Sequence, residues 1–394
     1  MTQKKKPVLR FKGFTDDWEQ RKIGDCFTER KESMPKGELL SVTINEGIKR
    51  FSELERHDSS NQDKSKYKKV CIGDIAYNSM RMWQGASGFS DYEGIVSPAY
   101  TVLKPHDGID ARFVSYLFKT KDLIHVFQIN SQGITSDNWN LKFPVLSTIN
   151  IKIPEKIEEQ NKIAEFLAKL DNLITLHQRK YNKLQNLKKY FLEKMFPQNG
   201  KRVPEIRFAG FTDDWEQRKY SNVINLISGQ DFEPSQYNEN KEGIPYLTGA
   251  SCIENGHTVA VRWTQTPRCI AEKGDTVLVC KGSGYGTIAV VDQEKAHIAR
   301  QFMAVKAIDG EIDKAFNYYL LYSVIESIKK DARGLIAGIA RDAVLNQPVL
   351  IPNIDEQVKI AHSLTNLDNL ITLHQRKLEK LQNLKKAALD KMFV

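Results

Sequence analysis

The sequence predicts an α+β protein with two globular domains of mixed sheets and helices, joined by two long antiparallel coiled-coil helices in a pseudo-twofold internal repeat. Three observations support this fold class. Two blocks of sequence occur twice at one constant spacing. Apolar residues in the second block follow coiled-coil periodicity, and the stretches between the blocks mix β-like and helical runs.

The repeated blocks define the organisation of the chain. Residues 160–196 and 357–393 are identical at 27 of 37 positions, whereas 23–153 and 220–351 share no obvious similarity. The sequences FTDDWEQRK and LDNLITLHQRK each recur 197 residues later, at 14–22 and 211–219 and at 170–180 and 367–377. This period is far too long for a solenoid, so it indicates two whole domains, each followed by the same helix.

The duplication also predicts the domain boundaries and the direction of the helices. If each helix packs against its copy, the contact is isologous and the two helices run antiparallel. The expected segments are a first globular domain, a central helix, a second globular domain and a distal helix, at 1–153, 154–197, 198–351 and 352–394.

Each variable stretch has the composition of a compact α+β domain. The β-like runs are CIGDIAY, GIVSPAYTVL and INIKIP in the first stretch and IPYLTG, DTVLVC, TIAVVD and PVLIP in the second. The helical patterns ARFVSYLFKT and AFNYYLLYSVIESIKK lie between them, and Gly, Asn and Ser mark the turns.

The long helices are predicted from their start signals and periodicity. Acidic residues follow Pro154 and Pro352, which favours a first turn at the positive end of the helix dipole, and Pro197 ends the first helix. About 40 residues at about 1.5 Å each give a rod of roughly 60 Å. Apolar positions step by three and four residues. This seam comprises Leu167, Leu170, Ile174, His177, Tyr181, Leu184, Lys188, Phe191 and Met195, and its copy comprises Leu364, Leu367, Ile371, His374, Leu378, Leu381, Lys385, Ala388 and Met392.

Two features of these helices have alternative interpretations. His177 and His374 could be metal ligands or general bases, but a polar residue on a seam more often fixes coiled-coil register or has a satisfied hydrogen bond. Leucines off the seam give each helix more apolar surface than a two-stranded coil buries, which predicts docking of partner helices unless the variable domains pack there. These leucines are Leu173, Leu176, Leu187, Leu370, Leu373 and Leu384.

Composition excludes several classes of protein. With 41% apolar and 27% charged residues, the chain is expected to be globular, and without a run of about 18 apolar residues it is expected in the cytoplasm, away from membranes. The five cysteines form no CxxC pair, so neither disulfides nor a zinc site are expected. The net charge of +9 invites a polyanionic partner, and residues 1–200, with 33 basic and 25 acidic residues, carry most of the excess.

No catalytic motif is convincing. The segment KGSGYGT at 281–287 has GxGxG spacing and leads into the β-branched TIAVVD, so a hairpin is expected in place of a phosphate-binding turn. SPAY at 97–100 lacks the leading Asn or Asp and the second proline of an amino-methyltransferase motif, and a β-edge segment is expected there. The P-loop, HExxH, GxSxG and zinc-deaminase patterns are absent. The chain is therefore expected not to be an enzyme and to hold no metal or cofactor.

Side chains suited to reading DNA bases gather in loops. Arg pairs with guanine, and Asn or Gln with adenine, in the major groove. The first variable domain offers Asn78, Arg81 and Gln84 beside Trp83, and Asn138 and Asn140 beside Trp139; the second offers Lys281, Ser283, Tyr285, Arg300, Gln301, Arg333 and Arg341. An ordinary surface role is the alternative for each residue. Residues 201–356 hold 18 basic against 21 acidic residues, so neutralisation of DNA phosphates is expected from elsewhere.

Over essentially its whole length the chain resembles the specificity (S) subunits of type I restriction-modification systems. The resemblance rests on RF.GFTDDWEQRK at 10–22 and 207–219, on P…EQ.KIA at 154–164 and 352–361, and on LDNLITLHQRK…LQNLKK. The segment NSMRMWQGASG…GIVSPAYTVLKP is similar to one common type of first recognition domain. The resemblance implies two target-recognition domains, each reading one half of a bipartite double-stranded DNA site, and helices that set the spacer between the halves.

The same resemblance implies partner subunits. The conserved regions would bind two methyltransferase (M) subunits, through which translocase/nuclease (R) subunits attach. The cofactors S-adenosylmethionine, ATP and magnesium would serve those partners, and this chain would choose the site without doing chemistry.

Other classes of protein fit the sequence less well. A stand-alone methyltransferase needs an NPPY-type motif and a cofactor fingerprint, and the sequence contains neither. A structural coiled-coil adaptor that binds protein partners without DNA explains the helices, but not two dissimilar domains rich in Arg, Asn and Trp between nearly identical connectors. An inhibitor that mimics DNA should be strongly acidic, and this chain is basic.

Overall fold

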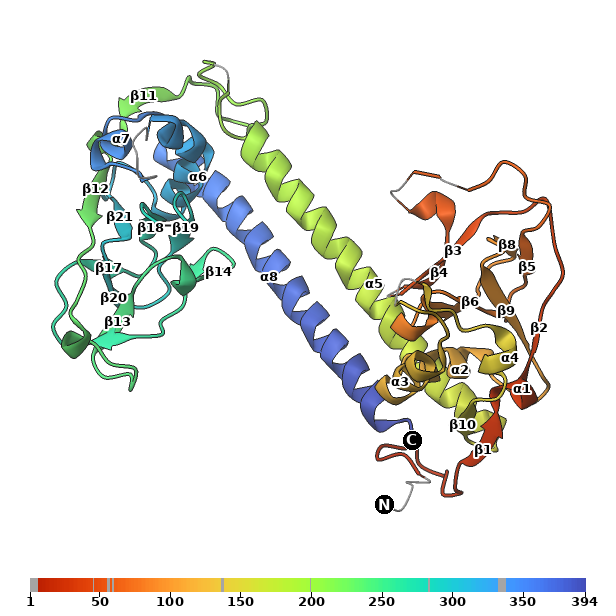
Figure 1. Cartoon of the computed structure of the whole chain (residues 1–394). Helices are drawn as coiled ribbons and strands as arrows, with labels where there is room; N and C mark the ends of the chain where they lie inside the picture. The colour runs from red at the N-terminus through yellow and green to blue at the C-terminus, as the bar shows by residue number, and fades with distance from the viewer. Residues whose placement is uncertain are drawn as a thin grey trace. The chain divides into compact units, whose positions relative to one another are not determined.

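Two compact units make up the structure. The computed structural model describes residues 6–44, 46–54, 57–58, 60–135, 138–198, 200–282, 284–331 and 338–394. Spatial contacts group Met1–His177 with Lys377–Val394 in one unit and place Gln178–Arg376 in the other. Two long helices, α5 (Ile157–Lys194) and α8 (Ile354–Lys391), are unbroken, and each contributes to both units (Figure 1). Over the described residues, no helix combines the length and apolar character that a membrane crossing requires.

An antiparallel four-stranded sheet forms the centre of the first unit. Its strand order is β2 (Phe27–Glu29), β9 (Tyr100–Pro105), β6 (Ile75–Asn78) and β7 (Ser87–Phe89). Smaller ladders pair β3 (Leu40–Thr43) with β4 (Gly47–Arg50) and β5 (Lys68–Val70) with β8 (Gly94–Val96). The shorter helices are α1 (Ile23–Cys26), α2 (Ala111–Leu117), α3 (Lys121–Asn130) and α4 (Phe143–Leu146).

The second unit repeats this sheet and adds to it. Its strand order is β12 (Ile224–Ser228), β21 (Phe302–Ala307), β18 (Thr276–Val279), β19 (Ile288–Val290), β15 (His257–Thr258) and β14 (Ile253–Glu254). A further sheet contains β16 (Trp263–Thr264), β13 (Ile244–Leu247), β20 (Lys295–Ile298) and β17 (Ile270–Glu272). The shorter helices are α6 (Lys314–Asp331) and α7 (Arg341–Leu345).

The two variable domains therefore share a topology that their sequences do not reveal. The orders β2-β9-β6-β7 and β12-β21-β18-β19 are the same, and every pair within them is antiparallel. A helix, α2 or α6, follows the corresponding strand β9 or β21. The parallel pairs β13–β20 and β15–β19 occur in the additions to the second domain. The predicted α+β class with mixed sheets is confirmed.

The repeated sequence blocks close each variable domain with the same short ladder. The EQRK part of FTDDWEQRK forms β1 (Glu19–Lys22), which pairs with β10 (Asn150–Ile153), and its copy forms β11 (Glu216–Lys219), which pairs with β22 (Pro348–Ile351). Both ladders are antiparallel with equivalent registers. Each variable domain thus begins and ends at one place, next to the start of a long helix.

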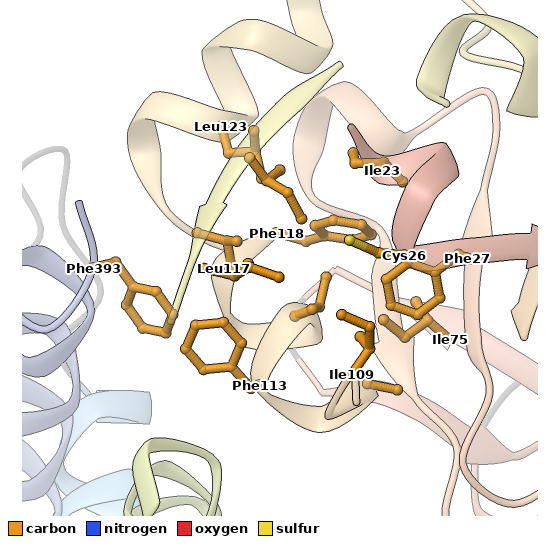
Figure 2. Packing of buried hydrophobic residues seen from close by; sticks show 14 of the residues in the cluster. Ile23, Cys26, Phe27, Ile75, Ile109, Phe113, Leu117, Phe118, Leu123 and Phe393 are labelled. Atoms are coloured by element: carbon orange, nitrogen blue, oxygen red, sulfur yellow. The ribbon is translucent and has the colours of Figure 1, made fainter. Parts of the chain in front are cut away.

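Aromatic packing joins each domain to the ends of both long helices. In the first unit, Trp18 and Phe113 lie 5.7 Å apart by ring centroid. Phe393, after the end of α8, lies 5.3 Å from Phe113, and Figure 2 shows these two rings facing each other. In the second unit, the copies Trp215 and Phe196 lie 5.9 and 5.6 Å from Phe316. The tail of each long helix therefore completes the core around the start of the other helix, which is the predicted isologous, antiparallel arrangement within each unit.

A buried ion pair fixes the start of each long helix. Arg10 Nε and Nη2 donate to the two Glu159 carboxylate oxygens, each at 2.7 Å, and Arg207 bonds Glu356 in the same way at 2.7 and 2.8 Å. The glutamate side chains are 2% and 0% exposed. Their carboxylates therefore do more than complement the helix dipole, which is the role that the sequence predicts for the acidic residues.

The glutamine beside each glutamate connects the helix to the variable domain. Gln160 Oε1 accepts from the Asp110 N–H at 2.9 Å, and Gln357 Oε1 accepts from the Asp313 N–H at 2.9 Å. Asp110 and Asp313 in turn accept hydrogen bonds from the first-turn N–H groups of α2 and α6 through their side chains. One glutamine therefore ties the start of a long helix to the start of a domain helix.

Two local expectations were wrong. SPAY is not a β-edge segment: the N–H of Tyr100 donates to the Ser97 carbonyl at 2.9 Å, and that of Ala99 donates to Ser97 Oγ, so a turn separates β8 from β9. Of the three acidic residues expected in the first turn after Pro154, Glu158 and Glu159 lie there as expected, whereas Glu155 precedes helix α5.

Breaking the first ion pair should destabilise the fold much more than breaking a surface pair. Arg10→Ala leaves the Glu159 carboxylate buried without its counter-ion and should lower the free energy of unfolding by about 3–5 kcal/mol. The control is Arg21→Ala, because Arg21 is 37% exposed in its pair with Glu19 and should cost less than about 1 kcal/mol. Urea denaturation measures both, and equal losses would contradict the assignment.

Candidate nucleic-acid interface

Two hairpin loops occupy equivalent places in the variable domains. The first hairpin loop, residues 79–86, connects β6 to β7, and the second, residues 280–287, connects β18 to β19. Because both strand pairs hold the same positions in the common strand order, the loops lie at equivalent strand ends of the two sheets. Residues predicted to read DNA from within these loops are Arg81, Trp83, Gln84, Lys281 and Tyr285; Ser283 lies outside the described residues.

A second segment runs beside each hairpin loop. The Leu141 N–H donates to the Ser79 carbonyl at 2.9 Å, and the Ile339 N–H donates to the Cys280 carbonyl at 2.8 Å. The structure thus brings the segment that contains Asn138, Trp139 and Asn140 to the first hairpin loop. Arg333, which the sequence predicts to read DNA in the second domain, lies outside the described residues.

Two tryptophans join the first hairpin loop to its neighbouring segment. Trp83 and Trp139 meet edge to face, with ring centroids 5.2 Å apart and planes at 73°. Such a pair contributes about 0.5–1.5 kcal/mol beyond the area it buries. The Trp83 indole N–H donates to the Met80 carbonyl at 3.1 Å. The tryptophans therefore hold the loops together, and the Trp83 N–H is already used within the protein.

Arg81 and Asn138 are exposed polar side chains of this surface. The Arg81 guanidinium has no hydrogen bond or ion pair with any described residue. Asn78 differs, because its Oδ1 accepts from the Met80 N–H at 3.0 Å and so shapes the loop. Asn140 Oδ1 is buried without a partner among the described residues, and Gln84 is half-buried.

The predicted residues of the second domain fall into two groups. Lys281 and Gln301 are exposed, and the Gln301 amide lies beside Gly249. Arg300 and Arg341 have partners within the domain. Arg300 Nε pairs with Asp231 Oδ2 at 2.6 Å, whereas the Arg341 guanidinium donates to the Ser228 hydroxyl at 2.9 Å and to the Leu226 carbonyl at 3.0 Å. Tyr285 packs against the core, with Lys329 Nζ 5.5 Å from its ring.

Lys119 contacts the first hairpin loop, although the sequence did not single it out as a functional residue. Its ammonium donates to the Gly85 carbonyl in the first hairpin loop and to the Ile44 carbonyl at 2.8 Å. Burial, and then the charge of Lys385, lowers the pKa of Lys119 to about 8. No sequence pattern could have identified Lys119, because both of its acceptors are backbone carbonyls of distant segments.

The leucines predicted to dock partners are exposed on the long helices. Their exposed fractions are 43% for Leu173, 59% for Leu176, 36% for Leu187, 43% for Leu370, 45% for Leu373 and 47% for Leu384. Seam residues, by contrast, are buried or half-buried along both helices. The variable domains therefore do not cover these leucines, and equivalent leucines occur on both helices.

The seam histidines lie away from any cluster of possible metal ligands. His177 is half-buried, His374 is 6% exposed, and both have partners within the protein. In the part of the chain that the structure describes, no three His, Cys, Asp or Glu side chains come together in a way that could hold a metal ion.

Comparisons with known proteins identify the same architecture. The chain matches the type I restriction modification DNA specificity domain twice, at residues 15–186 and 212–383. It is 26% identical over 409 residues to the type I restriction enzyme MjaVIII specificity subunit of Methanocaldococcus jannaschii, covering 95% of this chain and 92% of the relative. It is 25% identical over 350 residues to the putative MjaX specificity subunit of the same organism, covering 84% and 80%.

Two solved structures share the fold. The S subunit of a type I restriction-modification system from M. genitalium superposes with a TM-score of 0.68 at 16% identity, covering 99% of both chains. A chain from a structure described as the basis of complex assembly and conformational transition of the type I R-M system gives a TM-score of 0.51 at 18% identity, covering 95% of this chain and 97% of the other.

Removing the aromatic contact should loosen the first hairpin loop without unfolding its sheet. In Trp139→Ala, amide hydrogens of residues 79–86 should exchange about two- to tenfold faster, because the edge-to-face contact with Trp83 is lost, while those of β9 keep their protection. Hydrogen-exchange mass spectrometry measures both segments. Tyr285→Ala is the control in the other domain and should leave 79–86 unchanged. Unaltered exchange in Trp139→Ala would show that the ring pair does not hold this loop.

Proposed function

Because this chain belongs to the family of type I restriction-modification DNA specificity proteins, we propose that each of its variable domains reads one half of a bipartite DNA site. The chain is the specificity subunit: it chooses the DNA sequence and performs no chemistry itself. The observation that carries the proposal is the pair of equivalent hairpin loops, which place different side chains in the same structural frame. A protein adaptor that binds no DNA would have no need of this arrangement.

Exposed polar groups at the hairpin loops support direct reading of bases. Arg81 and Asn138 in the first domain, and Lys281 and Gln301 in the second, are exposed at the equivalent strand ends. A guanidinium suits guanine, and an amide suits adenine, in the major groove. Trp83 and Trp139 act indirectly, by holding the reading segments in place.

The long helices would set the number of unspecified base pairs between the half-sites. Each has 38 residues, which corresponds to a length of about 57 Å and exceeds the roughly 34 Å of one B-DNA turn. A continuous helix has a defined rise for each residue, so it can serve as a spacer of fixed length.

The exposed leucines would bind the partner subunits. Leucines occur at equivalent positions of both helices and remain 36–59% exposed, so two copies of one partner, the methyltransferase (M) subunit, can dock in equivalent ways. Translocase/nuclease (R) subunits would attach through the M subunits. In this assembly, S-adenosylmethionine, ATP and magnesium serve the partner subunits, and the charge needed to neutralise DNA phosphates comes partly from the partners.

Substitution of one reading residue should affect one half-site. Arg81→Ala should weaken binding of the assembled methyltransferase to DNA with the cognate first half-site by about 1–3 kcal/mol, and should leave selectivity at the second half-site intact. Gln301→Ala is the reciprocal variant and should affect the second half-site. DNA titrations with each half-site replaced in turn measure this. Loss of selectivity at both halves in either variant would contradict independent readers.

Lengthening both helices should lengthen the spacer. Four helical residues inserted after Lys180 and again after Lys377 add about 6 Å of rise and keep each apolar stripe nearly in phase. The half-sites should move apart by about one or two base pairs of about 3.4 Å each. Insertion of two residues at the same points rotates the stripe by about 200° and should prevent assembly. Sequencing of methylated DNA tests this: an unchanged spacer in an assembled, active four-residue variant would rule out the helices as the spacer device.

A further inference from the structure

Each long helix carries an aspartate that is held by two other elements. Tyr116 Oη in α2 donates to Asp171 Oδ2 at 2.8 Å, and Lys385 Nζ in α8 pairs with Asp171 Oδ1 at 2.6 Å. We name these three residues the first triad. It links the variable domain and both long helices at one point of the first unit.

The second unit contains the same triad with the helices exchanged. Tyr319 Oη in α6 donates to Asp368 Oδ2 at 2.8 Å, and Lys188 Nζ in α5 pairs with Asp368 Oδ1 at 2.6 Å. The Tyr319 hydroxyl also lies 3.3 Å from Thr365 Oγ1. Asp368 and Lys385 are the repeat copies of Asp171 and Lys188, so the two ion pairs are reciprocal.

The tyrosines are unexpected, because they belong to the variable stretches. Tyr116 and Tyr319 each stand six residues after the aspartate that caps the domain helix, Asp110 or Asp313. Together with Phe113 and Phe316 they form the pattern Asp-x-x-Phe-x-x-Tyr in both domains, although most of the variable stretches have no obvious similarity. Retention of the same residue at the same helical position in dissimilar domains indicates a common means of attachment.

The environment of each triad favours a neutral tyrosine. Burial, and then the charge of Asp171, raises the pKa of Tyr116, so its phenol keeps the proton that it donates. Burial and Asp368 raise the pKa of Tyr319 in the same way. The ion-paired side chains are partly shielded, with exposures of 36% and 25% for Asp171 and Lys385 and 23% and 21% for Asp368 and Lys188. Such charge-assisted contacts are stronger and more directional than exposed ones.

We propose that the two triads are positioning devices that fix the orientation of each variable domain on the helix pair, and so restrict the complex to one spacer length. The inference rests on the proposed function. No triad residue belongs to a hairpin loop or to the segment beside it. A domain that tilts at this attachment shifts its whole hairpin loop along the DNA, while the side chains within the loop keep their arrangement. Spacer selectivity and base selectivity are therefore separable.

The test uses Tyr319→Phe, which removes one hydroxyl and keeps the ring. The matched control is Tyr322→Phe, on the same helix but 49% exposed. Each variant is assembled with its methyltransferase partner and supplied with DNA that carries both cognate half-sites at the natural spacer or at one base pair more or less. For Tyr319→Phe, methylation at the altered spacers relative to the natural one should rise about tenfold, with base preferences in each half-site unchanged. Tyr322→Phe should behave as the wild type.

Tyr116→Phe repeats the test independently in the other unit and keeps the inference testable if one variant does not fold. Spacer selectivity within twofold of the wild type in the folded Tyr→Phe variants would overturn the inference, as would altered base preference at an unchanged spacer. The proposed function fails separately, if the wild-type complex methylates DNA without requiring two half-sites.

Discussion

The structure depends on one buried contact that occurs twice, the bidentate ion pair between an arginine at the start of a domain and a glutamate at the start of a long helix. Arg10–Glu159 and Arg207–Glu356 each join segments 149 residues apart. The neighbouring glutamine then bonds the domain helix. Since the charges are almost wholly removed from water, loss of one residue leaves the other charge buried without a counter-ion. This requirement accounts for the presence of the same arginine and glutamate at equivalent positions of both repeats.

The residues that attach each domain to the long helices are separate from the surface that would read DNA. Buried aromatic rings, the glutamate–arginine pairs and the closing ladders use residues from the repeated blocks, together with a few fixed positions in the variable stretches, such as Phe113 and Phe316. Exposed side chains of the hairpin loops, such as Arg81 and Lys281, take no part in these contacts. Such side chains can therefore differ between the domains without disturbing the way in which either domain is attached to the helices.

Sequence alone was sufficient for the long helices, the repeat and the antiparallel arrangement, because helical periodicity is local and a duplicated contact implies its symmetry. It was not sufficient for the shared strand order, since strands such as β6 and β18 have only apolar character in common. Nor could the sequence reveal that the Trp83 indole N–H donates to the backbone carbonyl of Met80. Lys119 escaped notice for the same reason: backbone acceptors from distant segments leave no pattern in the sequence.

The seating of Phe393 in the core of the first unit has a consequence for the order of events at the ribosome. The second unit consists of the uninterrupted segment Gln178–Arg376, whereas the first also needs Lys377–Val394. The first unit therefore lacks part of its hydrophobic core until the last turns of α8 have been synthesised. The second unit has all of its residues before that point. During synthesis the second unit is therefore complete before the first. Until the end of α8 has been made, the apolar surface around Trp18 and Phe113 remains exposed to solvent.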